Sequence, residues 1–133
     1  MTTATIPATL LRIDSQAQFN HCVTEHEFLL VLFSASWCAP CQPFAKVYAE
    51  VAAQHPELMF ATVDIDTATD LAGNFQVTQV PALMVVRERI VIDMASGAMH
   101  AHELTHHVQM WQAFDMTAFS AHFEQKAIVE NHG

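Results

Sequence analysis

Hydrophobic and polar positions alternate along the chain in a pattern that predicts short strands separated by helices. Residues 28–34 are apolar almost throughout, which is typical of a strand covered on both faces. Residues 39–54 instead repeat apolar side chains at helical spacing. The strands predicted in this way are 8–13, 28–34, 59–65, 82–86 and 90–94. The predicted helices are 39–54, 67–75 and a short first helix that either Asp14 or Ser15 caps and that runs through His26.

The last two predicted strands are separated only by the tight turn Arg87-Glu88-Arg89. Strands so close in sequence pair antiparallel, whereas strands joined through a helix pair parallel. The chain therefore predicts an α/β fold with a mixed central β-sheet flanked by helices.

The chain from residue 98 onward is helical in character and longer than one closing helix needs. Asp115 is a candidate cap between two apolar patterns, one formed by Ala101, Leu104, Val108 and Trp111 and the other by Phe119 and Phe123. We interpret the chain as one domain, residues 1–133, with a core at about 8–98 and a helical C-terminal extension at about 99–127. Two roles stay open for the apolar side chains of this extension, core packing or a homodimer contact; they are Met110, Trp111, Phe114 and Met116.

Composition narrows the classes of function. The chain has 133 residues, with 5 Lys and Arg against 14 Asp and Glu, and this acidic balance disfavours nucleic-acid binding through a basic groove. No apolar stretch approaches the length of a membrane-spanning helix, and no secretory signal is recognised at the N-terminus. Three cysteines, an odd number, argue against a secreted disulfide scaffold, so the cytoplasm is the expected compartment.

The most informative segment is Trp37-Cys38-Ala39-Pro40-Cys41, which follows the apolar strand directly. A thiolate, not a thiol, is the nucleophile in disulfide exchange, and a helix N-terminus favours a thiolate through its unpaired N–H groups and positive dipole end. We therefore expect Cys38 to attack and Cys41, one turn later, to resolve the mixed disulfide. Pro40 suits a first helical turn, where its missing N–H costs nothing.

The cysteine pair has two other interpretations. One is half of a zinc site, but such a site needs two further ligands and no second cysteine pair exists. The other is a chance pairing in a buried segment. The neighbouring Trp and the inner Pro favour redox chemistry over both.

With these residues in place, the sequence resembles the thioredoxin family. Residues 33–41 match that family's active-site segment, 63–66 its third-strand motif, and Val80-Pro81 and Gly97 its proline and glycine positions. The resemblance implies a thioredoxin fold and disulfide reductase activity. It also implies that Pro81 is cis and faces Cys38, bringing the Val80 backbone to an extended substrate chain.

Two positions depart from the family. Thioredoxins usually carry a buried Asp five residues before the Trp and a Lys on the third strand, whereas this chain has Leu32 and Thr62 there. In the family that pair helps to move protons to and from the resolving cysteine. Its replacement should leave Cys41 in a dry, uncharged setting that raises its pKa and slows its attack.

The leading hypothesis is a dithiol–disulfide oxidoreductase of protein substrates. Cys38 and Cys41 cycle through a disulfide without a bound cofactor, Trp37, Val80 and Pro81 contact the substrate, and Ala39 and Pro40 shape the loop. Electrons come from an external, thioredoxin-reductase-type donor, because the chain contains no nucleotide-binding motif. The alternative is a binding or assembly helper with little turnover, which the loss of the Asp and Lys favours and the intact cysteine pair opposes.

A second motif, His102-Glu103-Leu104-Thr105-His106, formally matches a zinc-peptidase pattern. No third ligand is evident, and the helical spacing places both histidines opposite the apolar face. We therefore expect no functional metal site. The remaining cysteine, Cys22, is expected to be a small buried side chain on the first helix.

Overall fold

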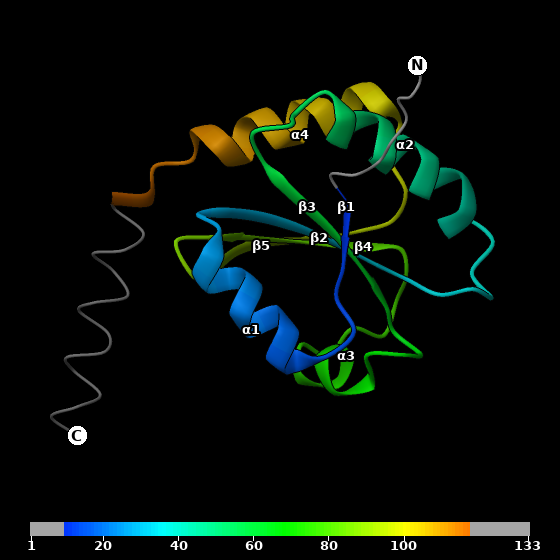
Figure 1. Cartoon of the computed structure of the whole chain (residues 1–133). Coiled ribbons are helices and arrows are strands. Elements are labelled where there is room, and N and C mark those ends of the chain that lie inside the picture. The colour runs from blue at the N-terminus through cyan, green and yellow to red at the C-terminus, as the bar shows by residue number, and fades with distance from the viewer. Residues whose placement is uncertain (1–9, 118–133) are drawn as a thin grey trace, which may run out of the picture.

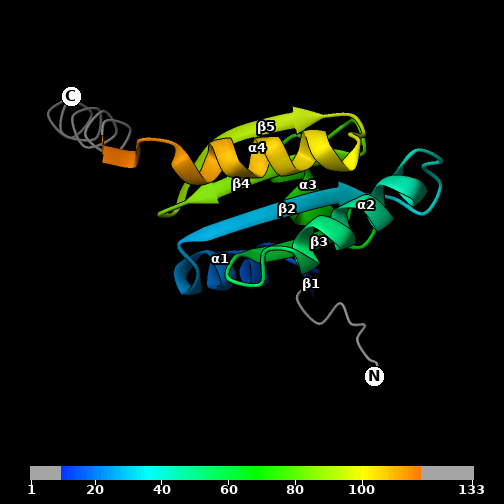
Figure 2. The ribbon, with the colours of Figure 1, turned by 90° about the horizontal axis from the view of Figure 1, so that it is seen from above.

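A computed structural model describes residues 10–117, and the strands in that part of the chain form one twisted sheet. Strands β1, β3 and β2 run parallel, while β4 is antiparallel to β2 and β5 to β4, which confirms the mixed sheet (Figure 2). The order across the sheet is β1-β3-β2-β4-β5. The strands are β1 (Leu10–Arg12), β2 (Phe28–Ser34), β3 (Met59–Asp64), β4 (Ala82–Arg87) and β5 (Ile90–Ser96).

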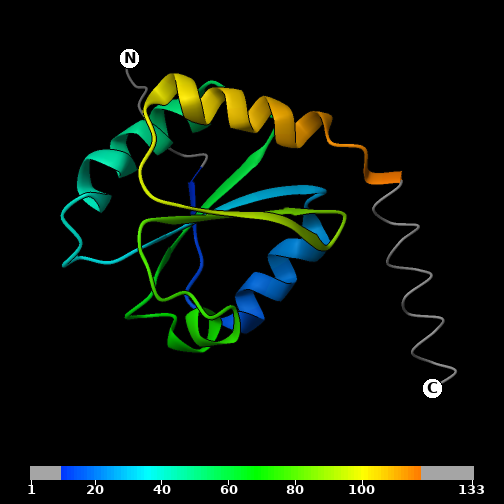
Figure 3. The same ribbon diagram turned by 180° about the vertical axis from the view of Figure 1, so that it is seen from behind.

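Helices cover both faces of this sheet. Figures 1 and 3 show α2 and α4 on one face and α1 and α3 on the other. The first helix begins where a polar side chain caps it, because Ser15 Oγ accepts the Gln18 N–H at 3.1 Å. The helices are α1 (Gln16–Glu25), α2 (Cys41–Ala53), α3 (Thr69–Asn74) and α4 (Ala101–Ala113). None of the helices described is long and apolar enough to span a membrane.

The central strand β2 supplies side chains to two separate core layers. Leu29, Val31 and Phe33 face α1 and α3, while Phe28, Leu30 and Leu32 face α2 and α4. All six are at most 5% exposed. This alternation explains the unbroken apolar run in the sequence, because a strand with helices on both faces has no solvent face.

Helix α4 belongs to the packed core. Leu104, Val108 and Trp111 lie in the same apolar cluster as side chains of α2, and the Trp111 indole N–H donates to Asp93 of β5 at 2.9 Å. Ala101 was predicted on this buried face, but it is exposed because the buried stripe begins one turn further on, at Leu104.

The apolar side chains of the C-terminal region divide between core and surface. Met116 is buried, whereas Met110 is 52% exposed. Asp115 accepts the Thr117 N–H at 3.1 Å just after α4 ends, in keeping with its predicted capping position. Phe119 and Phe123 lie outside the described residues, and the homodimer contact stays a prediction.

One side chain connects the far end of the sheet to the end of α4. The Arg87 guanidinium donates to the carbonyl oxygens of Trp111, Gln112 and Phe114 at 2.9–3.2 Å. It also pairs with Glu27, which precedes β2, at 2.9 Å. A cation there donates to carbonyl groups at the end of the helix and interacts favourably with the helix dipole.

We predict that Arg87→Ala lowers the free energy of unfolding by roughly 2 kcal/mol, because hydrogen bonds to a charged, largely buried donor are lost together. Arg87→Lys should recover only part of this loss, since an ammonium group lacks the planar fork of donors. The matched control is Arg12→Ala, which breaks an exposed ion pair with Asp14 and should cost less than about 1 kcal/mol. Equal losses in urea unfolding for Arg87→Ala and Arg12→Ala would contradict this assignment.

Candidate active site

The cysteine pair lies where β2 passes into α2. The chain leaves β2 after Ser34, turns through Ala35, and enters the helix at Cys41. Cys38 and Cys41 form a disulfide, with Cα atoms 5.3 Å apart. The turn is held by its own backbone, because the Cys38 N–H donates to the Ala35 carbonyl at 3.2 Å and the Cys41 N–H to the Cys38 carbonyl at 3.3 Å.

The first backbone N–H groups of α2 were predicted to be unpaired, and this prediction was wrong. The N–H groups of Cys41 and Gln42 are already bonded to the carbonyls of Cys38 and Ala39, and Pro40 caps the helix without a side-chain hydrogen bond. The reason is that the tight turn bonds these N–H groups to its own carbonyl groups. Any stabilisation of a Cys38 thiolate by this helix therefore comes from the aligned peptide dipoles.

Both sulfur-bearing residues are enclosed by apolar neighbours. Cys38 is 4% and Cys41 2% exposed, in a cluster with Ala35 against which Ile65 and Val80 pack. The described part of the chain contains no buried polar or charged residue. A buried acid or base that exchanges protons with Cys41 is thus absent from residues 10–117.

The positions that depart from the thioredoxin pattern lie side by side. Leu32 of β2 and Thr62 of β3 are register partners on adjacent parallel strands. Leu32 is 1% exposed and belongs to the apolar layer that α2 covers. The hydrocarbon side chain of Leu32 therefore occupies the position that corresponds to the buried Asp of the thioredoxin pattern.

Trp37 lies beside the disulfide with most of its surface in solvent. It is 64% exposed, and its indole N–H donates to the Asp66 carboxylate at 2.8 Å. The Asp66 N–H in turn donates to Asp64 at 2.8 Å. Sequence reasoning did not assign Asp66, although β2 and β3 are parallel and must bring the loops after Ser34 and Asp64 to one sheet edge.

The loop before β4 forms the other wall of the site. The Val80–Pro81 bond is cis, and the carbonyl oxygen of Val80 lies 3.6 Å from the Cys38 sulfur. The Gly97 N–H donates to the Pro81 carbonyl at 2.9 Å, and its φ of 96° is a conformation that favours glycine. An open hollow of about 520 Å³ separates these walls, lined by Trp37, Thr78, Gln79, Val80, Pro81, Ser96 and Gly97.

The histidine motif lies on α4, away from the disulfide. Glu103 accepts the His100 N–H at 3.0 Å, a bond that lowers the pKa of this carboxyl and closes the first turn of the helix. His102 and His106 are exposed. Within residues 10–117 no three histidine, cysteine or acidic side chains converge on a position that would hold a metal ion.

A disulfide between two cysteines at the start of a helix, next to the loop of Val80 and Pro81, is the arrangement of a dithiol–disulfide oxidoreductase site. The thioredoxin family model matches residues 11–110. A putative thioredoxin 2 from Streptomyces coelicolor is 35% identical over 102 residues, which span 77% of this chain and 76% of that protein.

Solved structures agree with this assignment. A thioredoxin of Fasciola hepatica has a TM-score of 0.71 at 26% identity, over 75% of this chain and 97% of that one. A Plasmodium falciparum thioredoxin has a TM-score of 0.69 at 26% identity, over 79% and 99%. The chain belongs to the thioredoxin family and is a thiol–disulfide oxidoreductase that acts on protein disulfides through its cysteine pair.

The third cysteine allows a test of which thiol is reactive. Cys22 is 3% exposed, and burial, with a smaller contribution from Glu25, raises the pKa of its thiol. In the reduced protein at neutral pH we predict that iodoacetamide alkylates Cys38 more than about tenfold faster than Cys22. Only thiolates react, and the dipole of α2 favours a thiolate at Cys38, whereas the pKa of the Cys22 thiol is raised. Peptide mapping by mass spectrometry gives both rates. Equal rates in folded protein would contradict this reading of the two environments.

Proposed function

We propose that the protein reduces disulfides of client proteins, with Cys38 as the attacking and Cys41 as the resolving cysteine. The observation that carries this assignment is the distance of 3.6 Å between the Cys38 sulfur and the carbonyl oxygen of Val80, a residue that lines the open hollow. Cys41 is the first residue of α2, is 2% exposed, and lies in the same apolar cluster as Cys38, within reach of its sulfur.

The reaction conserves electrons in two exchanges. The Cys38 thiolate attacks one sulfur of the client disulfide, forms a mixed disulfide and expels the other client sulfur as a thiolate, which takes a proton from water. The Cys41 thiolate then attacks the Cys38 sulfur, closes the intramolecular disulfide and releases the second client thiolate. The client gains two electrons and two protons, and the cysteine pair loses them.

The walls of the hollow account for how a client chain is held. Val80 offers backbone groups beside the reacting sulfur, so an extended client segment can pair with them as an added strand. Trp37, fixed by Asp66, presents a largely exposed indole at the rim. Main-chain pairing is independent of client sequence, which suits an enzyme that serves several disulfides.

The electron supply and the compartment are part of the proposal. A flavin or nicotinamide fold is not recognised in the sequence, so an external thioredoxin-reductase-type donor would restore the dithiol. The buried free thiol of Cys22 fits the cytoplasm, where such thiols stay reduced.

A second candidate is a binding or assembly role with little turnover. The observation in its favour is the uncharged pair Leu32 and Thr62, which leaves no buried carboxylate or amine to exchange protons with Cys41 within the described residues. A thiol that loses its proton slowly resolves a mixed disulfide slowly, so complexes with clients would persist.

The decisive variants are Cys41→Ser and Cys38→Ser. Cys41→Ser should retain the first exchange and lose the second, so a covalent complex with a disulfide client such as insulin accumulates and disappears on addition of dithiothreitol. Cys38→Ser should form none, and Cys22→Ser should behave as wild type.

Non-reducing gels with mass-spectrometric mapping of the junction identify the cysteine that is linked to the client. A complex through Cys41, or insulin reduction that survives in Cys38→Ser, would show that the assignment of roles is wrong.

A further inference from the structure

A groove separates the start of α4 from the first turns of α2, the helix that begins at Cys41. It measures about 370 Å³, and the two helices lie side by side on one face of the sheet (Figures 1 and 2). We call it the α2–α4 groove. It is lined by Pro43, Phe44 and Val47 of α2, by Ala98 and Met99 of the loop after β5, and by His100 and Glu103 at the start of α4.

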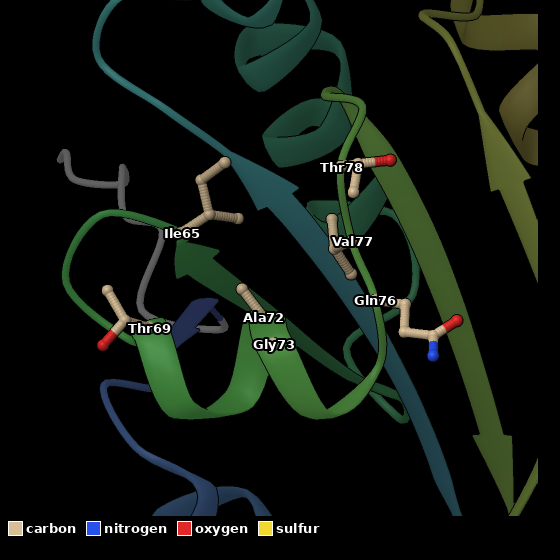
Figure 4. A pocket seen from close by; sticks show the side chains of 7 residues that line it. All are labelled: Ile65, Thr69, Ala72, Gly73, Gln76, Val77 and Thr78. Carbon is tan, nitrogen blue, oxygen red and sulfur yellow. The ribbon is translucent and has the colours of Figure 1, made fainter.

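This groove is separate from the hollow beside the disulfide. The α2–α4 groove and the hollow that Val80 and Pro81 line have no residue in common. The larger hollow of about 630 Å³ beside α3, shown in Figure 4, shares Thr78 with the Val80 hollow and therefore continues the client site. An occupant of the α2–α4 groove thus leaves the residues proposed to contact a client uncovered.

The floor of the α2–α4 groove is hydrocarbon. Phe44 is 1% exposed and belongs to the core layer beneath α2 and α4, and Val47 and Met99 pack against this layer while staying partly exposed. An apolar side chain placed there removes further apolar surface from water, which is favourable. The volume is near the low end of the roughly 300–1,000 Å³ of ligand pockets, so it suits one or two side chains of a peptide segment.

One carboxylate stands at the rim of the groove. Glu103 is exposed, and its Oε1 accepts the His100 N–H at 3.0 Å. This bond, with smaller contributions from nearby imidazoles, lowers the pKa of the carboxyl, which is therefore ionised at neutral pH. The other oxygen, Oε2, has no hydrogen-bond or ion-pair partner among residues 10–117, and no Lys or Arg lines the groove.

These charges select a cationic occupant over an anionic one. An acidic segment would be repelled by Glu103 and by the net charge of −9 that the chain carries with neutral histidines. A Lys or Arg next to a large apolar residue fits both parts of the groove. The apolar side chain covers the floor at Phe44 and Val47, and the cation reaches Oε2 while its own hydrocarbon stem lies along the groove.

We propose that the α2–α4 groove is a docking site for a segment of a partner protein in which a Lys or Arg flanks a large apolar residue. The inference goes beyond the proposed function, because it adds a binding surface outside the client hollow. A disulfide protein that carries such a segment is held at two places, and this linkage raises the effective concentration of its disulfide at Cys38.

The probe is the cysteine-free peptide acetyl-Gly-Leu-Arg-Leu-Gly-amide, titrated into the oxidised, uniformly ¹⁵N-labelled full chain. We expect chemical-shift changes at the backbone amides of Val47, Met99 and Glu103, and the titration gives the dissociation constant. The same peptide with Glu in place of Arg should bind roughly tenfold more weakly, because it brings like charges together. Replacing both leucines by glycine should abolish the shifts, since little apolar surface is then buried.

Glu103→Gln tests the rim carboxylate without removing the acceptor for the His100 N–H, because Gln also completes a capping box. It should weaken binding of the Arg peptide roughly threefold, as expected for an exposed ion pair. The matched control is Glu50→Gln, which makes the same change in net charge at an exposed position of α2 outside the groove lining and should leave the affinity unchanged. Thermal unfolding followed by circular dichroism checks that both variants fold.

Equal affinities for the Arg and Glu peptides, or equal effects of Glu103→Gln and Glu50→Gln, would overturn the inference. Shifts centred on Val80 and Gly97 would place the peptide in the client hollow and overturn it as well. Concentration-dependent shifts at the groove amides without peptide would assign the groove to a second copy of the chain, again against the proposal. Cys38-dependent reduction of dithiobis(nitrobenzoate) tests the proposed function separately, since its absence would contradict that function and leave the docking site standing.

Discussion

Burial of β2 on both faces is the constraint on which the site depends. Its side chains alternate between two apolar layers and are almost fully enclosed, and each one buried contributes about 1.5–3 kcal/mol relative to exposure. A strand held in this way ends at a defined place. The loop from Ala35 to Pro40 therefore emerges at one edge of the sheet, and Cys38 is fixed against the Val80 carbonyl because β4 pairs with the same strand.

The same enclosure determines the electrostatics of the redox centre. Around the cysteine pair the structure provides apolar walls and a helix dipole, and in the described part of the chain it provides no buried charge. The charges at this edge, such as Asp66, are at the surface and hold Trp37 in place. The reactivity of Cys38 thus depends on the start of α2. Among the described residues no buried group accepts a proton from Cys41, so that proton passes to solvent.

The sequence predicted the fold well because its patterns are local. The fully apolar run at residues 28–34 and the turn at residues 87–89 each specify a nearby structure, and their positions agree with the strands found. Of the two candidate caps for the first helix, Asp14 and Ser15, the structure uses Ser15. The predicted limits of the helices were less accurate. Residues 67–75 were expected to be helical, whereas α3 covers Thr69–Asn74, because no side chain caps its start.

The parts of the site that could not be predicted depend on contacts between distant segments. The bond from Trp37 to Asp66 and the hollow that Val80 and Pro81 line follow from how loops meet at one sheet edge. The spacing of cysteines along the chain contains no information on these contacts. The role of Arg87 at the end of α4 was missed for the same reason, since its partners are more than twenty residues away.

The most direct test of the account is the reduction potential of the Cys38–Cys41 pair, measured by equilibration in thiol–disulfide buffers with acid quenching and mass-spectrometric counting of free thiols. The account predicts a reversible two-electron transition near the value of about −270 mV that is characteristic of thioredoxins. A pair that stays oxidised or reduced across the accessible range, with no reversible transition, would contradict a catalytic disulfide and favour a binding role for the fold.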